Sequence, residues 1–418
     1  MLNRTNTPIL KSIETIEFVK PKIYDISKSA RLFFMKEVPN DTSRIDLYFD
    51  AGTMKGNLGI AAFVNGLLLS GTKEKSSIII HNELDALGAF HESTISHENA
   101  IISIYALKEN LIPILRLYKN AIENVIFDPQ EVEELVSDRK QKFRVNMEKV
   151  SFLAQRVFQN QLFDGSPYGR VLNAEDYDNL SIAEMKLFHK EHYMNGLTKV
   201  VVVGDLSQDE IDEIIDLTGT WATESVLEFE KELVNRKEKT HVEKLGALQS
   251  AIRLGKILFN KSHEDFIDFQ VLNTILGDYF GSRLMSNIRE DKGYTYGIGS
   301  MLAELHETGY FLIATEVGKD VKDATLKEIQ FEIERLKTDL VPQEELDLVK
   351  NYLLGQLLKS ADGPYSMIDL YMGLEPYGLD MEFYNESIRK IQRITPERIR
   401  ELAQKHLKWE DFTIVSAG

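Results

Sequence analysis

Residues 129–136 read PQEVEELV, and residues 342–349 read PQEELDLV, a near-copy that begins 213 positions later. A second match, at a shift of 214, pairs residues 180–192 (LSIAEMKLFHKEH) with residues 394–406 (ITPERIRELAQKH). Two matches at nearly one offset indicate that the chain contains a long internal repeat, which is the signature of a duplicated architecture.

The repeat predicts how the chain is divided into domains. Each copy ends in a β-rich run that finishes with glycine, KVVVVG at 199–204 and FTIVSAG at 412–418. We therefore expect an N-terminal lobe over residues 1–220 and a C-terminal lobe over residues 246–418. Residues 221–245 are charged and have neither turn signals nor a clear apolar face, so they are predicted to connect the lobes.

Local patterns predict the same mixture of elements in each half. In the first half, residues 44–51 alternate as a strand, and long helical patterns cover residues 111–125 and 129–157, with Pro129 at a favourable helix start. Strands that follow one another in sequence, mixed with helices, indicate α+β lobes in which a mainly antiparallel sheet is covered by helices.

The bulk properties exclude several functional classes. The chain has 418 residues and a formal net charge of −17 at pH 7, which disfavours binding to nucleic acids and anionic membranes, although a local basic patch could still exist within an acidic surface. It contains no cysteine, which excludes disulfides, thiol catalysis and cysteine zinc ligands. Residues 1–22 have no apolar run typical of a secretory signal, and no run is long enough to span a bilayer. We therefore expect a cytoplasmic protein with no nucleic-acid or membrane partner, although a mature exported chain without its signal would have the same features.

A helical segment in the first half carries the first functional signal. Residues 59–72 read GIAAFVNGLLLSGT and resemble the active-site helix of the pitrilysin family of zinc peptidases, which includes insulinase-like and mitochondrial-processing-peptidase-like enzymes. In that family the helix carries H-x-x-E-H, in which two histidines on one helix face bind zinc and the glutamate activates a water. Here the two histidine positions are Ala62 and Gly66, and the glutamate position is Asn65. None of these side chains can do that chemistry, so the resemblance implies a member with no zinc cofactor and no catalytic residue of its own.

Two remaining groups of possible ligands are interpreted as structural. The further glutamate ligand of the family falls within residues 129–147, where Glu131, Glu133 and Glu134 cluster. Without the two histidines, these glutamates are predicted to be solvated helix charges.

His81, His91 and His97 form a loose cluster in the sequence, and the last two fall on a predicted hairpin. Their spacing matches no known ligand pattern, so we interpret them as surface or hairpin histidines. The chain also has no G-x-S-x-G elbow, so a serine nucleophile has no support.

The second half carries a different signal. Residues 281–297 read GSRLMSNIREDKGYTYG and are predicted to form a helix that ends at Gly293, followed by a strand. This segment resembles the C-terminal substrate-binding motif of the same family, an arginine and a tyrosine seven residues apart, which are Arg289 and Tyr296 here. A guanidinium can donate two hydrogen bonds to carbonyl oxygens, and a phenol can help to stabilise a tetrahedral oxyanion. Without the resemblance, a helix-end charge and a half-buried strand tyrosine would explain the same two residues.

The resemblance extends over nearly the whole chain and implies two lobes that close like a clamshell. It implies a non-catalytic, substrate-binding subunit of a heterodimeric zinc metalloendopeptidase, whose H-x-x-E-H partner supplies the zinc and the base. Arg289 and Tyr296 would complete that composite active site, and the substrate would be an extended peptide. The alternative is a proteolytically inactive homodimer that binds peptides or serves as a structural or assembly scaffold.

Overall fold

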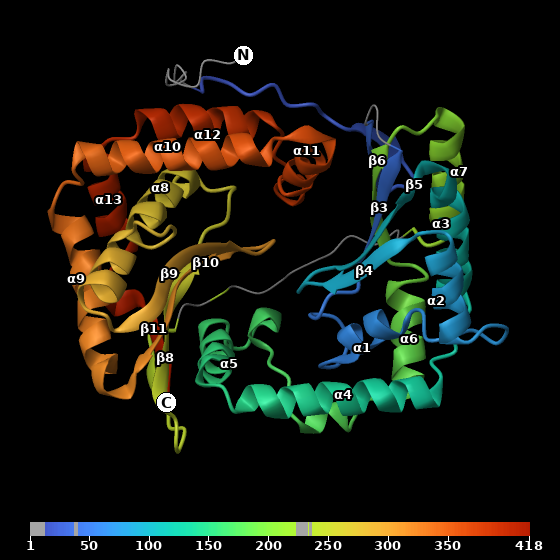
Figure 1. Ribbon diagram of the computed structural model, residues 1–418, viewed down its shortest axis with the longest axis horizontal. Coiled ribbons are helices and arrows are strands. Elements are labelled where there is room, and N and C mark those ends of the chain that lie inside the picture. Colours follow the sequence, from blue (N-terminus) through green and yellow to red (C-terminus); the bar gives the residue numbers. More distant parts are fainter. Residues whose placement is uncertain (1–12, 37–40, 223–232, 234–235) are drawn as a thin grey trace, which may run out of the picture.

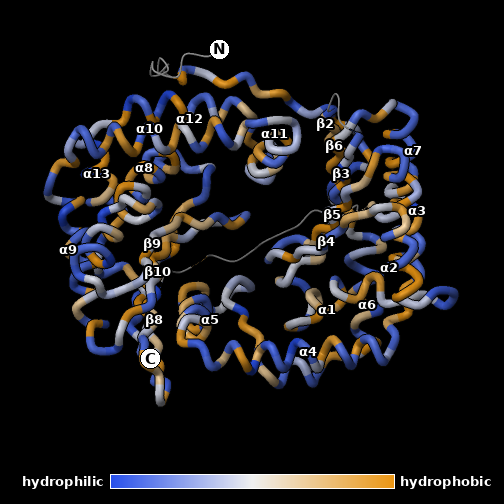
Figure 2. The backbone as a smooth tube through the Cα atoms, viewed as in Figure 1, coloured by the Kyte–Doolittle hydropathy of each residue, from blue (hydrophilic) through white to orange (hydrophobic). Residues whose placement is uncertain are grey.

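The computed structural model describes residues 13–36, 41–222, 233 and 236–418. Its elements form two lobes, one from each half of the sequence, and each lobe is built around one sheet (Figure 1). Helices pack against these sheets, and hydrophobic residues follow the strands of both lobes (Figure 2). The predicted α+β fold with two helix-covered lobes in a clamshell arrangement is confirmed. In the described part of the chain, no helix combines the length and the apolarity that crossing a bilayer would need.

The first lobe contains a six-stranded sheet in the order β1-β2-β6-β3-β5-β4, in which only the β2–β6 pair is parallel. The strands are β1 (Lys22–Asp25), β2 (Arg31–Lys36), β3 (Thr42–Phe49), β4 (Phe90–Ile95), β5 (Ala100–Leu107) and β6 (Leu197–Gly204). Most helical residues of its core belong to α1 (Ile60–Leu67), α2 (Ser77–Ala86), α3 (Lys108–Glu123), α6 (Ile182–His192) and α7 (Gln208–Gly219). Strand β6 is a run of valines because both of its faces are buried: Val200 and Val202 belong to this core, whereas Val201 and Val203 pack on the opposite face.

The second lobe contains a five-stranded sheet in the order β7-β11-β8-β10-β9, in which only the β7–β11 pair is parallel. The strands are β7 (Lys239–Val242), β8 (Gln249–Leu258), β9 (Thr295–Glu304), β10 (Gly309–Gly318) and β11 (Thr413–Ala417). The helices of its core are α8 (Phe266–Leu276), α9 (Lys322–Thr338), α10 (Gln343–Ser360), α12 (Glu382–Arg393) and α13 (Pro396–His406). Strand β7 lies inside the segment 221–245 that the sequence predicts as a connector, and residues 223–232 and 234–235 of that segment lie outside the described residues.

Each half of the chain also covers the sheet of the other half. The helical pattern at 129–157 forms two helices, α4 (Pro129–Met147) and α5 (Val150–Leu162), instead of one. Helix α5 packs against β8 and β11 of the second sheet, where Phe158 lies against Gly255 and a Cβ at that glycine would stand 2.8 Å from the ring. In return, α11 (Gly363–Met372) places the buried Ile368 against the free face of the first sheet. This exchange joins the two lobes through apolar contacts. Figure 1 shows α5 on the side of the second sheet and α11 beside the first.

A polar seam accompanies the apolar contacts between the lobes. Arg44 of β3 forms ion pairs with Asp46 (3.1 Å) and with Asp369 of α11 (2.5 Å), and Arg44 and Asp46 are both buried. At the tip of the β9–β10 hairpin, the backbone N–H of His306 donates to the Glu98 carboxylate at 3.3 Å. The Glu304 end of β9 therefore touches the first lobe of the same chain, whereas its Thr295 end lies away from this contact.

Candidate functional site

The helix that resembles a zinc helix is α1, and it is held in the core of the first lobe. Asn65, at the glutamate position of the motif, is only 7% exposed. Its Oδ1 accepts a hydrogen bond from the hydroxyl of the fully buried Tyr193 at 3.1 Å, and its Nδ2 donates to the Thr94 carbonyl of β4 at 3.5 Å. The amide is therefore bonded to the protein on both sides, so its role is structural.

The two histidine positions also do not fit a metal ion. Ala62 and Gly66 have no ligand atom, and a Cβ added at Gly66 would stand 3.3 Å from Cδ2 of Leu135 on α4. Leu135 therefore occupies the space into which a longer side chain would extend. The residues present at this place do not supply the donor atoms that a zinc site requires.

The three glutamates of α4 have different surroundings. Glu131 accepts a hydrogen bond from the Ser77 hydroxyl at 2.5 Å, Glu134 accepts one from Gln130 at 3.0 Å, and Glu133 is exposed. Among the residues that the structure describes, no group of three or more His, Cys, Asp or Glu side chains is arranged to hold a metal ion.

The three histidines are not brought together. The rings of His81 and His91 stack with their centroids 5.7 Å apart, whereas His97 lies in the turn after β4 and packs edge-on against Tyr168. Burial, together with the neighbouring His81, lowers the pKa of His91, which favours its neutral form near pH 7.

Replacing Asn65 with alanine is expected to lower the free energy of unfolding by about 1–3 kcal/mol, because the buried Tyr193 hydroxyl would lose its acceptor. Urea denaturation of Asn65→Ala, Tyr193→Phe and the double variant measures this effect. The double variant should lose less than the sum of the two single variants, since both remove the same bond. Strictly additive losses would show that the two side chains do not interact.

The arginine and tyrosine of the second lobe lie side by side. Arg289 belongs to a π-helical segment, Met285–Asp291, and Tyr296 is the second residue of β9. The guanidinium carbon of Arg289 lies 5.7 Å from the centroid of the Tyr296 ring, so the cation faces the aromatic ring. Tyr296 is 93% exposed, which leaves its hydroxyl available to a ligand.

The segment between these residues is held by the second lobe. Ile288, next to Arg289, is fully buried, and the N–H of Tyr294 donates to the Ile288 carbonyl at 3.0 Å. Gly293 ends the helical segment with φ +65°, the left-handed conformation expected of a C-cap glycine. Thr295 then donates through its hydroxyl to the Glu316 carbonyl of β10 at 2.8 Å. These contacts hold the backbone on both sides of the turn, so the two side chains are positioned before any ligand arrives.

The guanidinium of Arg289 has unused donors. Across the described ranges of the chain, no carboxylate lies within 4.0 Å of it, although it is only partly exposed. An arginine presents five N–H groups in a planar fork that suits carbonyl and carboxylate oxygens. A cation that is positioned but not neutralised is a candidate for binding a ligand.

One residue of this site was missed in the sequence. The guanidinium carbon of Arg289 lies 4.7 Å from the centroid of the Phe280 ring, closer than to Tyr296, and Phe280 is 65% exposed. Phe280 stands nine residues before Arg289, immediately ahead of the segment 281–297. A bulky aromatic residue in a loop beside a glycine was the available signal, but its contact with Arg289 depends on how the loop folds back.

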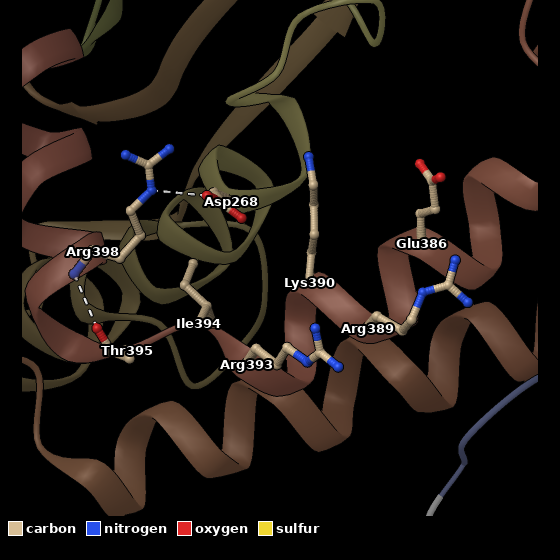
Figure 3. Close-up of a pocket in the computed structure, with 8 residues that line it drawn as sticks. All are labelled: Asp268, Glu386, Arg389, Lys390, Arg393, Ile394, Thr395 and Arg398. Atoms are coloured by element: carbon tan, nitrogen blue, oxygen red, sulfur yellow. Dashed lines mark hydrogen bonds and ion pairs between the residues drawn. The ribbon is translucent and has the colours of Figure 1, made fainter.

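A cavity of about 560 Å³ lies on the outer surface at the junction of α12 and α13 (Figure 3). Its lining contains Asp268, Glu386, Arg389, Lys390, Arg393, Ile394, Thr395 and Arg398. Arg398 donates to Asp268 at 2.8 Å and to Asp265 at 2.6 Å, and Arg389 donates to Glu382 at 2.7 Å. Much of the positive charge is therefore balanced. The exposed Arg393 is a suitable control for substitutions of Arg289.

Comparison with known proteins gives the same family for both halves. Residues 32–173 match the model described as insulinase (peptidase family M16), and residues 179–353 match the peptidase M16 inactive domain. The uncharacterized zinc protease YmxG of Bacillus subtilis is 22% identical over 364 residues, 85% of this chain and 87% of that protein. The non-peptidase homolog YmxG of Helicobacter pylori is 22% identical over 369 residues, 86% of this chain and 84% of that protein. A peptidase M16 inactive domain from Pseudomonas fluorescens has a similar structure, with a TM-score of 0.87 and 23% identity over 96% of this chain and 98% of that one.

Proposed function

Because this chain belongs to the insulinase family of peptidases (family M16), we propose that it is the non-catalytic, substrate-binding subunit of a heterodimeric zinc metalloendopeptidase. One contrast carries the proposal. The side chains at the zinc and base positions, Ala62, Asn65 and Gly66, cannot bind zinc or act as a base. The partly exposed Arg289, in contrast, lies against the exposed ring of Tyr296.

Each chain of the complex would supply one part of the active site. The partner, a homologue that carries H-x-x-E-H, would hold the zinc and the glutamate base. Arg289 would donate hydrogen bonds to backbone carbonyls of an extended peptide, and the Tyr296 hydroxyl would donate to the oxygen that becomes negative in the transition state. The first lobe of this chain would take no part in the catalytic step.

The position of the pair supports a role for a second chain. Strand β9 meets the first lobe of its own chain near Glu304, and Tyr296 lies eight residues earlier. At about 3.3 Å per residue, this distance along the strand is about 26 Å. The Arg289–Tyr296 pair is therefore well separated from that contact, and a partner lobe could approach it.

Co-expression with an H-x-x-E-H homologue, followed by an assay on a quenched fluorescent peptide, tests the proposal. We expect the two chains to co-purify and the complex to cleave the peptide, whereas this chain alone is inactive and binds no stoichiometric zinc. Full activity of the partner alone would favour the alternative of an inactive homodimeric scaffold. Stoichiometric zinc in the purified chain would contradict its assignment as the non-catalytic subunit.

A further inference from the structure

An apolar cavity lies on the second lobe beside Phe280, the residue that contacts the Arg289 guanidinium. It has a volume of about 540 Å³ and is formed by β9, β10, the loop after α8 and the start of the π-helical segment. Its lining is mainly apolar and contains Gly277, Asp278, Tyr279, Phe280, Met285, Ile298, Gly299, Ser300, Met301, Leu312 and Ala314. Phe280, which contacts the Arg289 guanidinium, is also a wall of this cavity.

The hollow follows from the register of two strands. Gly299 of β9 pairs with Ala314 of β10, and the next pair on the same face is Met301 with Leu312. Two small residues opposite each other leave space that a larger neighbouring pair then encloses. A side chain at Gly299 would have room, because its Cβ would approach only the Gly277 carbonyl, at 3.4 Å.

Two large apolar side chains at the cavity are unusually exposed to solvent. Phe280 is 65% exposed and Met301 is 48% exposed, although both are large and apolar. The Tyr279 ring lies 5.3 Å from that of Tyr352, which extends the patch onto α10. Exposed apolar residues that gather in one concave place indicate a binding site more strongly than the same residues scattered over a surface.

The edge of the sheet sets where a peptide could lie. Among the residues that the structure describes, no strand pairs with the outer side of β9, but the N–H of Ser300 already donates to the Gly277 carbonyl of the loop at 3.1 Å. A peptide backbone held by Arg289 would therefore meet the edge only before Ser300, beside Tyr296 and Ile298. Successive side chains of an extended peptide point in opposite directions, so one of them would enter the cavity.

We propose that this cavity is a specificity pocket for one bulky apolar side chain, aliphatic or aromatic, of the peptide whose backbone Arg289 holds. The proposal rests on the substrate-binding role above and adds the chemical class of the preferred residue. A hydrophobic side chain of leucine or phenylalanine size would bury the exposed faces of Phe280 and Met301 and displace water from the cavity.

Peptide binding to the purified full chain tests this pocket separately from catalysis. The probes are fluorescein-labelled decapeptides of alternating alanine and serine with phenylalanine, leucine, serine or glutamate at the centre, measured by fluorescence anisotropy. We expect the phenylalanine and leucine peptides to bind at least about tenfold more tightly than the other two, which corresponds to about 1.4 kcal/mol. Gly299→Val should abolish this preference and leave the serine peptide within about twofold.

Other variants distinguish failure of the pocket from failure of the proposed function. Arg289→Ala should weaken all four peptides by a similar factor, and Arg393→Ala should change none of them. Ala314→Leu fills the same cavity from β10 and replaces Gly299→Val if that variant does not fold. Equal binding of all four peptides, with Arg289→Ala still weakening each, would overturn the pocket alone. Absence of binding by every peptide, or binding that is insensitive to Arg289→Ala, would overturn the substrate-binding role as well.

Discussion

Arg289→Ala is expected to lower kcat/KM of the assembled peptidase complex by about 10- to 150-fold, because a hydrogen bond from a charged donor to the peptide backbone contributes about 1.5–3 kcal/mol. The guanidinium has no carboxylate partner within 4.0 Å in the described chain, so its donors are available to the substrate. It also contacts the rings of Phe280 and Tyr296, which limit its movement, so little reorganisation is needed when a peptide binds. Initial rates on a quenched peptide, over a range of concentrations, would separate the effects on kcat and KM.

The control for this experiment is Arg393→Ala, which removes an exposed arginine from the outer cavity shown in Figure 3. It should change kcat/KM by less than about twofold, because it lies in a cavity lined by neither Arg289 nor Tyr296. Both variant complexes must be shown to assemble by size-exclusion chromatography and to retain the zinc of the partner. If Arg289→Ala then keeps the rate of the unmodified complex, the role proposed for Arg289 is wrong.

Asp265→Ala is expected to lower the free energy of unfolding by about 3 kcal/mol, because this carboxylate is buried and joined to three cationic or titratable side chains. Its oxygens accept hydrogen bonds from Lys405 Nζ at 2.6 Å, Arg398 at 2.6 Å and His406 Nε2 at 2.8 Å. Lys405 and Arg398 keep access to water, so the loss should lie at the lower end of the range for breaking a buried ion pair. Urea denaturation followed by circular dichroism measures it.

The same carboxylate predicts how stability depends on pH. Burial alone would raise the pKa of Asp265, but the hydrogen bonds from Lys405, His406 and Arg398 outweigh it and hold the pKa well below its ordinary value of 3.8. The stabilisation is therefore present above pH 3.8 and is lost as the pH falls further, so the difference in unfolding free energy between the variant and the unmodified chain should shrink there.

Asp268→Ala, which removes one bond to Arg398, should lower the free energy of unfolding by less than about 1.5 kcal/mol and serves as the matched control. Equal losses in the two variants would contradict the central role given to Asp265.

Much of the fold could be predicted because repeats and periodic patterns of apolar residues can be read directly along the sequence. The internal repeat indicated two lobes, and alternation and helical periodicity indicated a sheet with helices in each, as the structure confirms. The exchange of α5 and α11 between the lobes left no such signal. An amphipathic helix shows that it has an apolar face, but its sequence does not state which sheet that face covers.

The candidate site divides in the same way. The amino-acid types alone established that Ala62, Asn65 and Gly66 lack the groups that bind zinc and activate water, since no arrangement of the chain can add a ligand atom to alanine or glycine. The seven-residue spacing likewise placed Arg289 and Tyr296 on either side of one turn. Two contacts, in contrast, are decided only by the tertiary structure. They are the Asn65–Tyr193 hydrogen bond, which joins residues 128 positions apart, and the contact of the Phe280 ring with Arg289. The tertiary structure also decides the cavity at Gly299 and Ala314. This cavity depends on which residues stand opposite each other in neighbouring strands, and strand register is a property of the folded sheet.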